Sequence, residues 1–270
     1  MPVPKNEYLS EVWKDGIFNN RVVFCTGGNG TICSAQVRAL VHLGANACIV
    51  GRNVPKTEGM AKDIATARKG AKVLGIGAID VRSIESLEGA VAQCVKELGG
   101  LDFVIAGAAG NFLASIADLS ANAMKTVIDI DVLGSYNTLK ATMPHLLSSA
   151  AQSKKDGIPG GRIIFITATF HYTAYPLQSH VSVAKAGVDA LAASAAIELG
   201  PKGVQSNAIA PGPILATEGM ERLSLTKDLT EIQRKVPSGR WGTVKDIADA
   251  TVFLFSDAGS LINGEVIVGK

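Results

Sequence analysis

The stretch Arg21-Val22-Val23-Phe24-Cys25-Thr26-Gly27-Gly28-Asn29-Gly30-Thr31-Ile32-Cys33 decides the fold. An apolar, β-branched run leads directly into three glycines and then into a helical pattern over 31–43. Glycines let the backbone turn tightly and approach a phosphate group, and the N-terminus of the following helix offers N–H groups and a partial positive charge. The spacing departs from GxGxxG, because Thr31 and Cys33 stand where that pattern has glycines. We interpret the loop as a dinucleotide site, with an ordinary strand-to-helix turn as the alternative. The predicted contacts are Thr26, Gly27, Gly28, Asn29, Gly30, Thr31 and Ile32.

Short apolar runs alternate with longer helical patterns along the rest of the chain. The runs are nearly continuous in hydrophobic residues, as expected when helices cover both faces of a parallel sheet. The pattern predicts one α/β domain over 1–270, a Rossmann-like, doubly wound parallel sheet of seven strands. The expected strands are Arg21–Thr26, Ala47–Gly51, Lys72–Ile76, Asp102–Ala106, Arg162–Thr167, Val204–Ile209 and Glu265–Val268, and the expected helices lie near 31–43, 54–68, 83–97, 120–149, 181–199 and 244–255.

Three segments interrupt this alternation. Residues 1–18 precede the first strand and are expected to form an N-terminal extension. The polar, Gly/Pro-rich segment 153–161 predicts a surface loop. A long connection follows the sixth strand, and we expect its residues 212–235 to form a lid over a substrate.

The composition is that of an ordinary globular protein, with 47% hydrophobic and 19% charged residues in 270. A net charge of +2 gives no reason to expect a nucleic-acid partner. No apolar run reaches the roughly 18 residues that a membrane span needs, and the N-terminus lacks the apolar centre of a signal peptide. The four cysteines include no CxxC pair, so we expect buried free thiols in a reducing compartment and no metal site.

The residues after the second and third strands bear on the cofactor. Arg52 stands where an acidic residue would bind the ribose of NAD, and its planar cation suits a 2′-phosphate. We therefore predict NADPH, although Arg52 can also be an ordinary surface arginine. Asp80, followed by Val81, ends the third predicted strand, where a carboxylate can accept from the adenine amino group or simply cap a turn.

Several further motifs match one family together. Ala106-Gly107-Ala108-Ala109-Gly110 follows the fourth strand, and Asn207 precedes Pro211-Gly212 after the sixth. Lys185 matches the lysine of a motif that begins with tyrosine four residues earlier, but Val181 replaces that tyrosine. Over about residues 18–268 the chain resembles the short-chain dehydrogenase/reductase family.

Within that family, two departures occur together. The family asparagine on the helix after the fourth strand is replaced by Asp131, and the tyrosine at 181 is absent. In both features the chain resembles the peroxisomal-type 2,4-dienoyl-CoA reductases. Phe170 stands where the mitochondrial type carries a tyrosine. The other matching motifs are Ala108–Leu113, Ile128–Asp131, Ile166–Thr169, Ala210–Ile214 and Thr217–Gly219.

The resemblance implies a reaction that needs no tyrosine. Hydride would go to the far end of a conjugated dienoyl thioester, and a carbon would then take a proton from a water bound by Asp131 and Lys185. Lys185 would also bind the nicotinamide ribose. Asp131 can instead be a structural carboxylate, and Lys185 a surface lysine. Additional cofactor contacts would be Ala106, Pro211, Gly212 and Ile214, and substrate contacts Asn111, Phe112, Thr167, Thr169 and Gly219.

Ordinary structural roles also fit some of these residues. Phe112 can belong to the core, the two threonines can be turn hydroxyls, and His171 and His180 are expected to be structural rather than catalytic. Two rival functions stay open: an enoyl or polyketide reductase on the same scaffold, and a non-catalytic NADP-binding partner protein.

Assembly and location are further expectations from the resemblance. Helices near 120–149 and 181–199 predict a homodimer or homotetramer, because small residues such as Gly187 and Ala192 permit close helix packing. An acyl-CoA thioester is the expected substrate. Peroxisomal location comes from the resemblance alone, since the chain does not end in a Ser-Lys-Leu-like tripeptide, and cytoplasmic location is the alternative.

Overall fold

The computed structural model describes residues 3–157, 160–217, 233–234 and 236–269. Its centre is a seven-stranded parallel sheet with the order β3-β2-β1-β4-β5-β6-β7. The order reverses between β1 and β4, so these neighbours form the switch point at which such sheets bind ligands. The predicted fold class is confirmed. The strands are β1 (Val22–Thr26), β2 (Asn46–Val50), β3 (Val73–Ile76), β4 (Phe103–Ala106), β5 (Arg162–Ile166), β6 (Gln205–Pro211) and β7 (Val266–Gly269).

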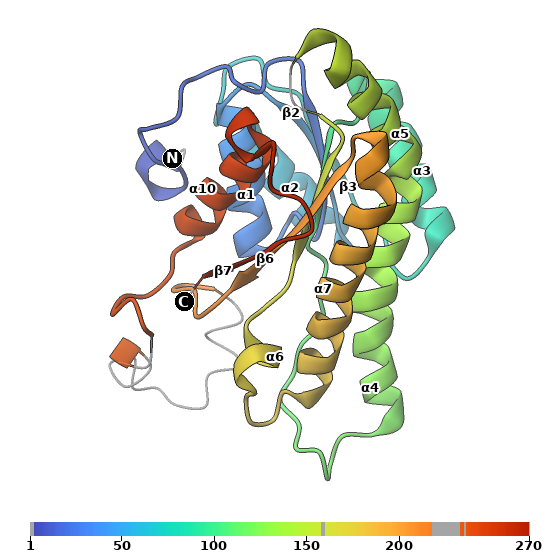
Figure 1. Cartoon of the computed structure of the whole chain (residues 1–270), viewed down its shortest axis with the longest axis vertical. Coiled ribbons are helices and arrows are strands. Elements are labelled where there is room, and N and C mark those ends of the chain that lie inside the picture. Colours follow the sequence, from blue (N-terminus) through green and yellow to red (C-terminus); the bar gives the residue numbers. More distant parts are fainter. Residues whose placement is uncertain (1–2, 158–159, 218–232, 235, 270) are drawn as a thin grey trace.

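Helices cover both faces of the sheet (Figure 1). Apolar residues of α1 (Thr31–His42), α2 (Val54–Ala65) and α10 (Val244–Phe255) form one core with the sheet. Residues of α3 (Ile84–Leu98), α5 (Gly134–Asp156) and α7 (Ser179–Leu199) form the other. Every residue of β1 and β4 is buried, because each strand lies between two helical layers. The shorter elements are η1 (Lys5–Glu7), α4 (Ala121–Ile128), η2 (Asp129–Leu133), α6 (Phe170–Thr173), η3 (Gly200–Lys202) and η4 (Asp257–Gly259).

The predicted helix over 120–149 differs from the observed structure in its middle and at its end. Residues Asp129–Leu133 form a π-helical turn that separates α4 from α5. The helix also continues to Asp156, so the predicted loop over 153–161 is wrong for its first four residues. Gly157 ends the helix with φ +70°, and its N–H bonds the carbonyl of Ser153.

Two smaller predictions of secondary structure also need correction. The third strand ends at Ile76, so Asp80 lies in the turn that follows rather than at the strand end. The short helix α6 was not predicted, because four residues carry too little periodicity to reveal a helix.

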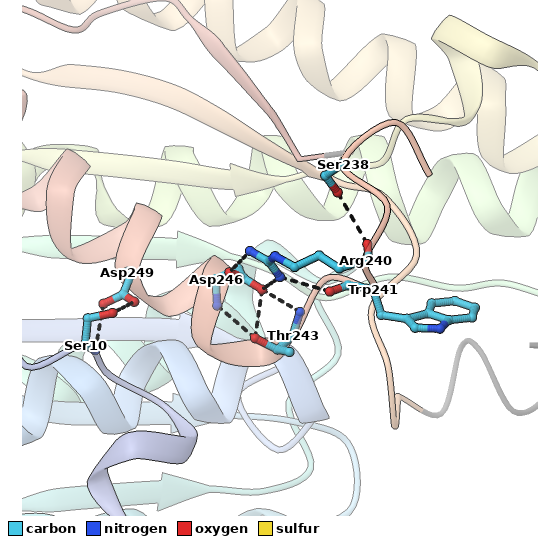
Figure 2. Close-up of polar contacts among 7 residues, drawn as sticks. All are labelled: Ser10, Ser238, Arg240, Trp241, Thr243, Asp246 and Asp249. Atoms are coloured by element: carbon cyan, nitrogen blue, oxygen red, sulfur yellow. Dashed lines mark hydrogen bonds and ion pairs between the residues drawn. The ribbon is translucent and has the colours of Figure 1, made fainter. Parts of the chain in front are cut away.

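The N-terminal residues pack against the body of the sheet and α10. Leu9 is fully buried in the core that α1 and α10 share. Ser10 donates to Asp249 of α10 through both its N–H and its hydroxyl, and Trp13 Nε1 donates to the same carboxylate at 2.7 Å. Figure 2 shows the Ser10 contact beside the start of α10.

The same figure shows how α10 begins (Figure 2). Thr243 and Asp246 form a capping box, in which each side chain accepts from the backbone N–H of the other residue. Arg240 adds two hydrogen bonds to the Asp246 carboxylate, at 2.7 and 2.8 Å. The Arg240 hydrogen bonds hold the pKa of Asp246 at about 2, well below its ordinary value.

Candidate active site

The glycine loop lies at the carboxyl end of β1, beside the end of β4. Gly27 has φ +68°, and a side-chain Cβ there would lie 2.9 Å from the carbonyl oxygen of Gly107. The Thr26 hydroxyl oxygen accepts from the N–H of Gly107 at 3.2 Å. Only a residue without a side chain fits at position 27, because the two loops are in contact.

Cys33 replaces a glycine of the usual pattern without opening the loop. Its buried Sγ points toward Gly107, where a Cβ would lie only 2.2 Å from the sulfur. The thiol therefore occupies space that the absent side chain of Gly107 leaves free. Cys25, Cys33, Cys48 and Cys94 are all buried and free, as predicted.

The residues of the loop fit a dinucleotide phosphate. Gly30 is the N-cap of α1 and supplies no side chain to the first N–H groups of the helix, and no acidic residue stands in the first turn. Thr31 is exposed and Ile32 half-buried at this end. Asn29 donates to the Thr57 hydroxyl at 2.9 Å and thereby joins the loop to α2. These N–H groups and the dipole of α1 suit an anion.

The residues predicted around the adenosine half lie beside this loop, after β2 and β3. The side chain of Arg82 forms a fork with the Asp80 carboxylate and is the main cause of the lowered pKa of Asp80. The exposed Arg52 adds a smaller lowering through its charge. Val81 is buried and its carbonyl accepts from Asn137 of α5 at 2.9 Å. Asp80 therefore organises a turn in this structure, and its predicted contact with adenine stays a prediction.

The other predicted cofactor residues end neighbouring strands. Ala106 is buried at the end of β4, in register with Thr26. Pro211 ends β6, and the N–H of Gly212 bonds the carbonyl of Gly269. Ile214 is buried and pairs with Gly242 in an isolated bridge. The sheet thus brings these residues to the same edge as the glycine loop.

Asp131 and Lys185, from η2 and α7, form a buried ion pair. Lys185 Nζ lies 3.0 Å from Asp131 Oδ2 and also donates to the Ile166 carbonyl at 3.0 Å. Asp131 Oδ1 accepts from the N–H of Gly110 at 2.7 Å. The π-helical turn places Asp131 here, since π turns of this kind re-aim side chains inside a helix and are frequent at functional sites.

Val181 lies one turn before Lys185 on α7. It is buried in a small apolar cluster with Val127 and Ala184, against which Phe112 and Phe170 also pack. Position 181, which carries a tyrosine in most members of the family that the chain resembles, is therefore part of an apolar cluster. No proton donor stands there.

Two other tyrosines lie nearby on and after α6. The Tyr172 hydroxyl donates to Asp189 of α7 at 2.9 Å. Burial, followed by the bond to Asp189, raises the pKa of Tyr172 to about 12. Tyr175 stacks on Phe170 with ring centroids 5.6 Å apart. Among the described contacts, the Tyr172 hydroxyl thus bonds Asp189 and not the Asp131–Lys185 pair.

The predicted substrate residues surround the same edge of the sheet. The Asn111 Oδ1 atom is buried without a partner among the described residues, and Phe112 is half-buried. Thr167 is buried and donates to the carbonyl of Ile209, and Thr169 precedes α6. The lid predicted over 212–235 lies largely outside the described residues, and Gly219 lies outside them altogether.

Sequence reasoning missed two groups of this site. The N–H of Gly110 and the carbonyl of Ile166 are main-chain contacts, which a motif of side chains does not reveal. His180, which was expected to be structural, is fully buried, and its Nε2 lies 3.0 Å from the Phe112 carbonyl.

The described residues contain no group of three or more His, Cys, Asp or Glu side chains that can hold a metal ion. Within the same residues, no helix is both long and apolar enough to cross a membrane.

The fold and the site define an oxidoreductase class. A family model described as enoyl-(acyl carrier protein) reductase matches residues 28–269. The chain belongs to the short-chain dehydrogenase/reductase family, whose members bind nicotinamide cofactors. Solved structures agree. A short-chain dehydrogenase from Bacillus anthracis is 31% identical with a TM-score of 0.78 over 93% of this chain and 95% of its own. A short-chain type dehydrogenase/reductase from Mycobacterium ulcerans is 27% identical with a TM-score of 0.84 over 93% and 88%.

Curated relatives narrow the class. The peroxisomal 2,4-dienoyl-CoA reductase of Saccharomyces cerevisiae, named as producing (3E)-enoyl-CoA, is 49% identical over 95% of this chain and 85% of its own. The enzyme of the same name from Danio rerio is 37% identical over 97% and 84%. A probable 2,4-dienoyl-CoA reductase of Bacillus subtilis, named as producing (2E)-enoyl-CoA, is 34% identical over 92% and 94%.

Proposed function

We propose that this chain is an NADPH-dependent 2,4-dienoyl-CoA reductase of unsaturated fatty acid β-oxidation. The observation that carries the proposal is the buried Asp131–Lys185 pair beside an apolar Val181. A carbonyl reductase must protonate an alkoxide as hydride arrives, and this site has no acid at the tyrosine position. Reduction of a dienoyl thioester does not have that requirement.

The proposed roles follow from the contacts. When bound, the reduced nicotinamide supplies a hydride to the δ carbon of the diene. The electron pair moves onto the thioester oxygen, and a proton then adds to the α carbon to leave a 3-enoyl thioester. Asp131 and Lys185 hold the water that gives this proton. The hydroxide that is left then takes up a proton from the solvent. The names of the peroxisomal relatives, which specify a (3E) product, support protonation at the α carbon.

The other residues bind and orient. The N–H groups at Gly30–Ile32 and the dipole of α1 bind the pyrophosphate. Arg52 binds the 2′-phosphate, which favours NADPH. Asn111 supplies a hydrogen bond to the thioester oxygen through the N–H groups of its side-chain amide, which are the donors that this residue offers. Lys185 also bonds the nicotinamide ribose.

The test is direct. Pure protein is mixed with NADPH and 2,4-hexadienoyl-CoA in D₂O, the nicotinamide absorbance is followed, and the product is examined by NMR. We expect turnover, a double bond at carbon 3 and deuterium at the α carbon. NADPH binding without turnover contradicts the proposal and favours a non-catalytic binding protein. Turnover of simple 2-enoyl thioesters instead favours an enoyl or polyketide reductase.

We further propose a homodimer or homotetramer located in peroxisomes. Tyr136 on α5 and Val183 and Ile197 on α7 are large apolar residues with 47%, 52% and 79% exposure. Their exposure along two helices fits a face that a second copy covers. Sedimentation of only a monomer contradicts this assembly. The peroxisomal location rests on the printed names of the relatives.

A further inference from the structure

His180 lies in the first turn of α7 and contacts Phe112 in two ways. The two rings stack with centroids 4.3 Å apart and an interplanar angle of 22°. His180 Nε2 also lies 3.0 Å from the Phe112 carbonyl oxygen. A carbonyl oxygen only accepts hydrogen bonds, so Nε2 carries the proton.

The second ring nitrogen makes no such contact. His180 is fully buried, and its Nδ1 has no partner among the described residues. The hydrogen bond that links this ring to the backbone is therefore the one that Nε2 donates to the Phe112 carbonyl.

The loop that His180 contacts leads directly to Asp131. Phe112 lies two residues after Gly110, whose N–H donates to Asp131 Oδ1 at 2.7 Å. The segment just before α7 also contacts this loop, where the N–H of Ala114 donates to the carbonyl of Leu177. The Asn111 Oδ1 atom between these points bonds no described residue. Main-chain hydrogen bonds from both sides therefore set the position of the loop.

We propose that His180 is a positioning residue for the Asp131–Lys185 pair. By stacking on Phe112 and donating to its carbonyl, His180 keeps the N–H of Gly110 on Asp131 and the carboxylate directed at Lys185. The consequence for catalysis rests on the function proposed above, whereas the contact itself can be tested without turnover.

Three variants isolate the hydrogen bond. His180→Phe keeps an apolar ring for the stack but removes the donor. His180→Gln removes the ring but retains an N–H donor. His145→Phe makes the same chemical change on α5, beside a cavity lined by Arg21 and Asp102 at the amino ends of the strands, away from the site.

Amide hydrogen exchange of peptides that contain residues 109–113 gives the first readout. In His180→Phe we expect the Gly110 amide to exchange about tenfold faster, the factor for one hydrogen bond worth about 1.4 kcal/mol. We expect kcat with 2,4-hexadienoyl-CoA to fall by about the same factor and the KM for NADPH to stay within about twofold. His180→Gln should lie closer to wild type in both readouts, and His145→Phe should match wild type.

Wild-type exchange at Gly110 in His180→Phe overturns the proposal, whatever the effect on kcat. Faster exchange over the whole chain with a lowered Tm also overturns it, since His180 would then contribute only to stability. If wild type itself does not reduce the dienoyl thioester, the proposed function fails while the exchange result still decides the contact.

Discussion

Lys185 Nζ lies 3.0 Å from Asp131 Oδ2, and only 8% and 0% of the two side chains are exposed. A buried carboxylate and a buried ammonium group stabilise each other, and removing either one leaves the other charge buried and unpaired. Lys185 also donates to the carbonyl of Ile166, and Asp131 accepts from the N–H of Gly110, so both charged groups are held in place. The pair is thus suited to bind a polar group beside the two charged atoms.

Replacing Asp131 should separate chemistry from cofactor binding. We expect Asp131→Ala to lower turnover by at least about 100-fold, the range for a lost acid or base, while NADPH still binds. Steady-state kinetics and a fluorescence titration with NADPH measure the two effects. Asp129→Ala is the matched control, because Asp129 lies in the same π turn but pairs with Lys125 of α4. Full activity of Asp131→Ala contradicts the water-mediated proton transfer.

Returning a tyrosine to position 181 should not create a carbonyl reductase. Val181 is 2% exposed and packs with Val127 and Ala184, so a phenol ring there overfills the cluster by an expected cost of about 1–3 kcal/mol. We expect Val181→Tyr to unfold at a lower temperature and to leave ketones unreduced. Val181→Ile, which adds one methylene, is the control for packing. Efficient ketone reduction by Val181→Tyr would mean that the apolar cluster adapts to the ring.

Arg52 should distinguish the two nicotinamide cofactors. A charge-assisted hydrogen bond is worth about 1.5–3 kcal/mol, so Arg52→Ala should raise the KM for NADPH by about 10- to 100-fold. The KM for NADH should change little, because NADH has no 2′-phosphate. Lys62→Ala removes an exposed positive charge from the last turn of α2 and should leave both values unchanged. Equal effects on the two cofactors would remove Arg52 from the proposed site.

Asp246 should stabilise the start of α10 in a pH-dependent way. Its pKa is lowered to about 2 in the folded chain from an ordinary 3.8, so the stabilisation is present above about pH 4 and is lost as the pH falls toward 2. We expect Asp246→Asn to cost about 1 kcal/mol at neutral pH, the usual value of a helix cap, and progressively less below pH 4. Urea unfolding at several pH values measures this, with the exposed Glu88→Gln as control. A difference that is undiminished at pH 2 contradicts the assignment to ionised Asp246.

The strands of the sheet could be predicted from the sequence, because a strand that is buried on both faces appears as a continuous apolar run. β1 and β4 are buried on both faces, so their residues are apolar without alternation. The end of α5 was missed because Lys154 and Lys155 are polar, although basic residues suit the last turn of a helix.

For the candidate site, the sequence indicated side chains but not their main-chain partners. The register of Lys185 and the aspartate at 131 could be recognised from motifs, but the N–H of Gly110 and the carbonyl of Ile166 have no side-chain signature. The N-terminal contacts were missed for a similar reason, since Ser10 and Trp13 reach Asp249 across 239 and 236 residues of sequence.

The π turn at Asp129–Leu133 makes the length of this helix as important as its composition. A π turn contains one residue more than an α-helical path between the same ends, and one residue corresponds to about 100° of rotation around a helix axis. Deleting a single residue from the turn would leave a regular α-helical path between α4 and α5 and would shift the residues that remain in the turn by about that angle. Asp131 would then face a different neighbour, although every side chain of the proposed catalytic site was still present in the chain.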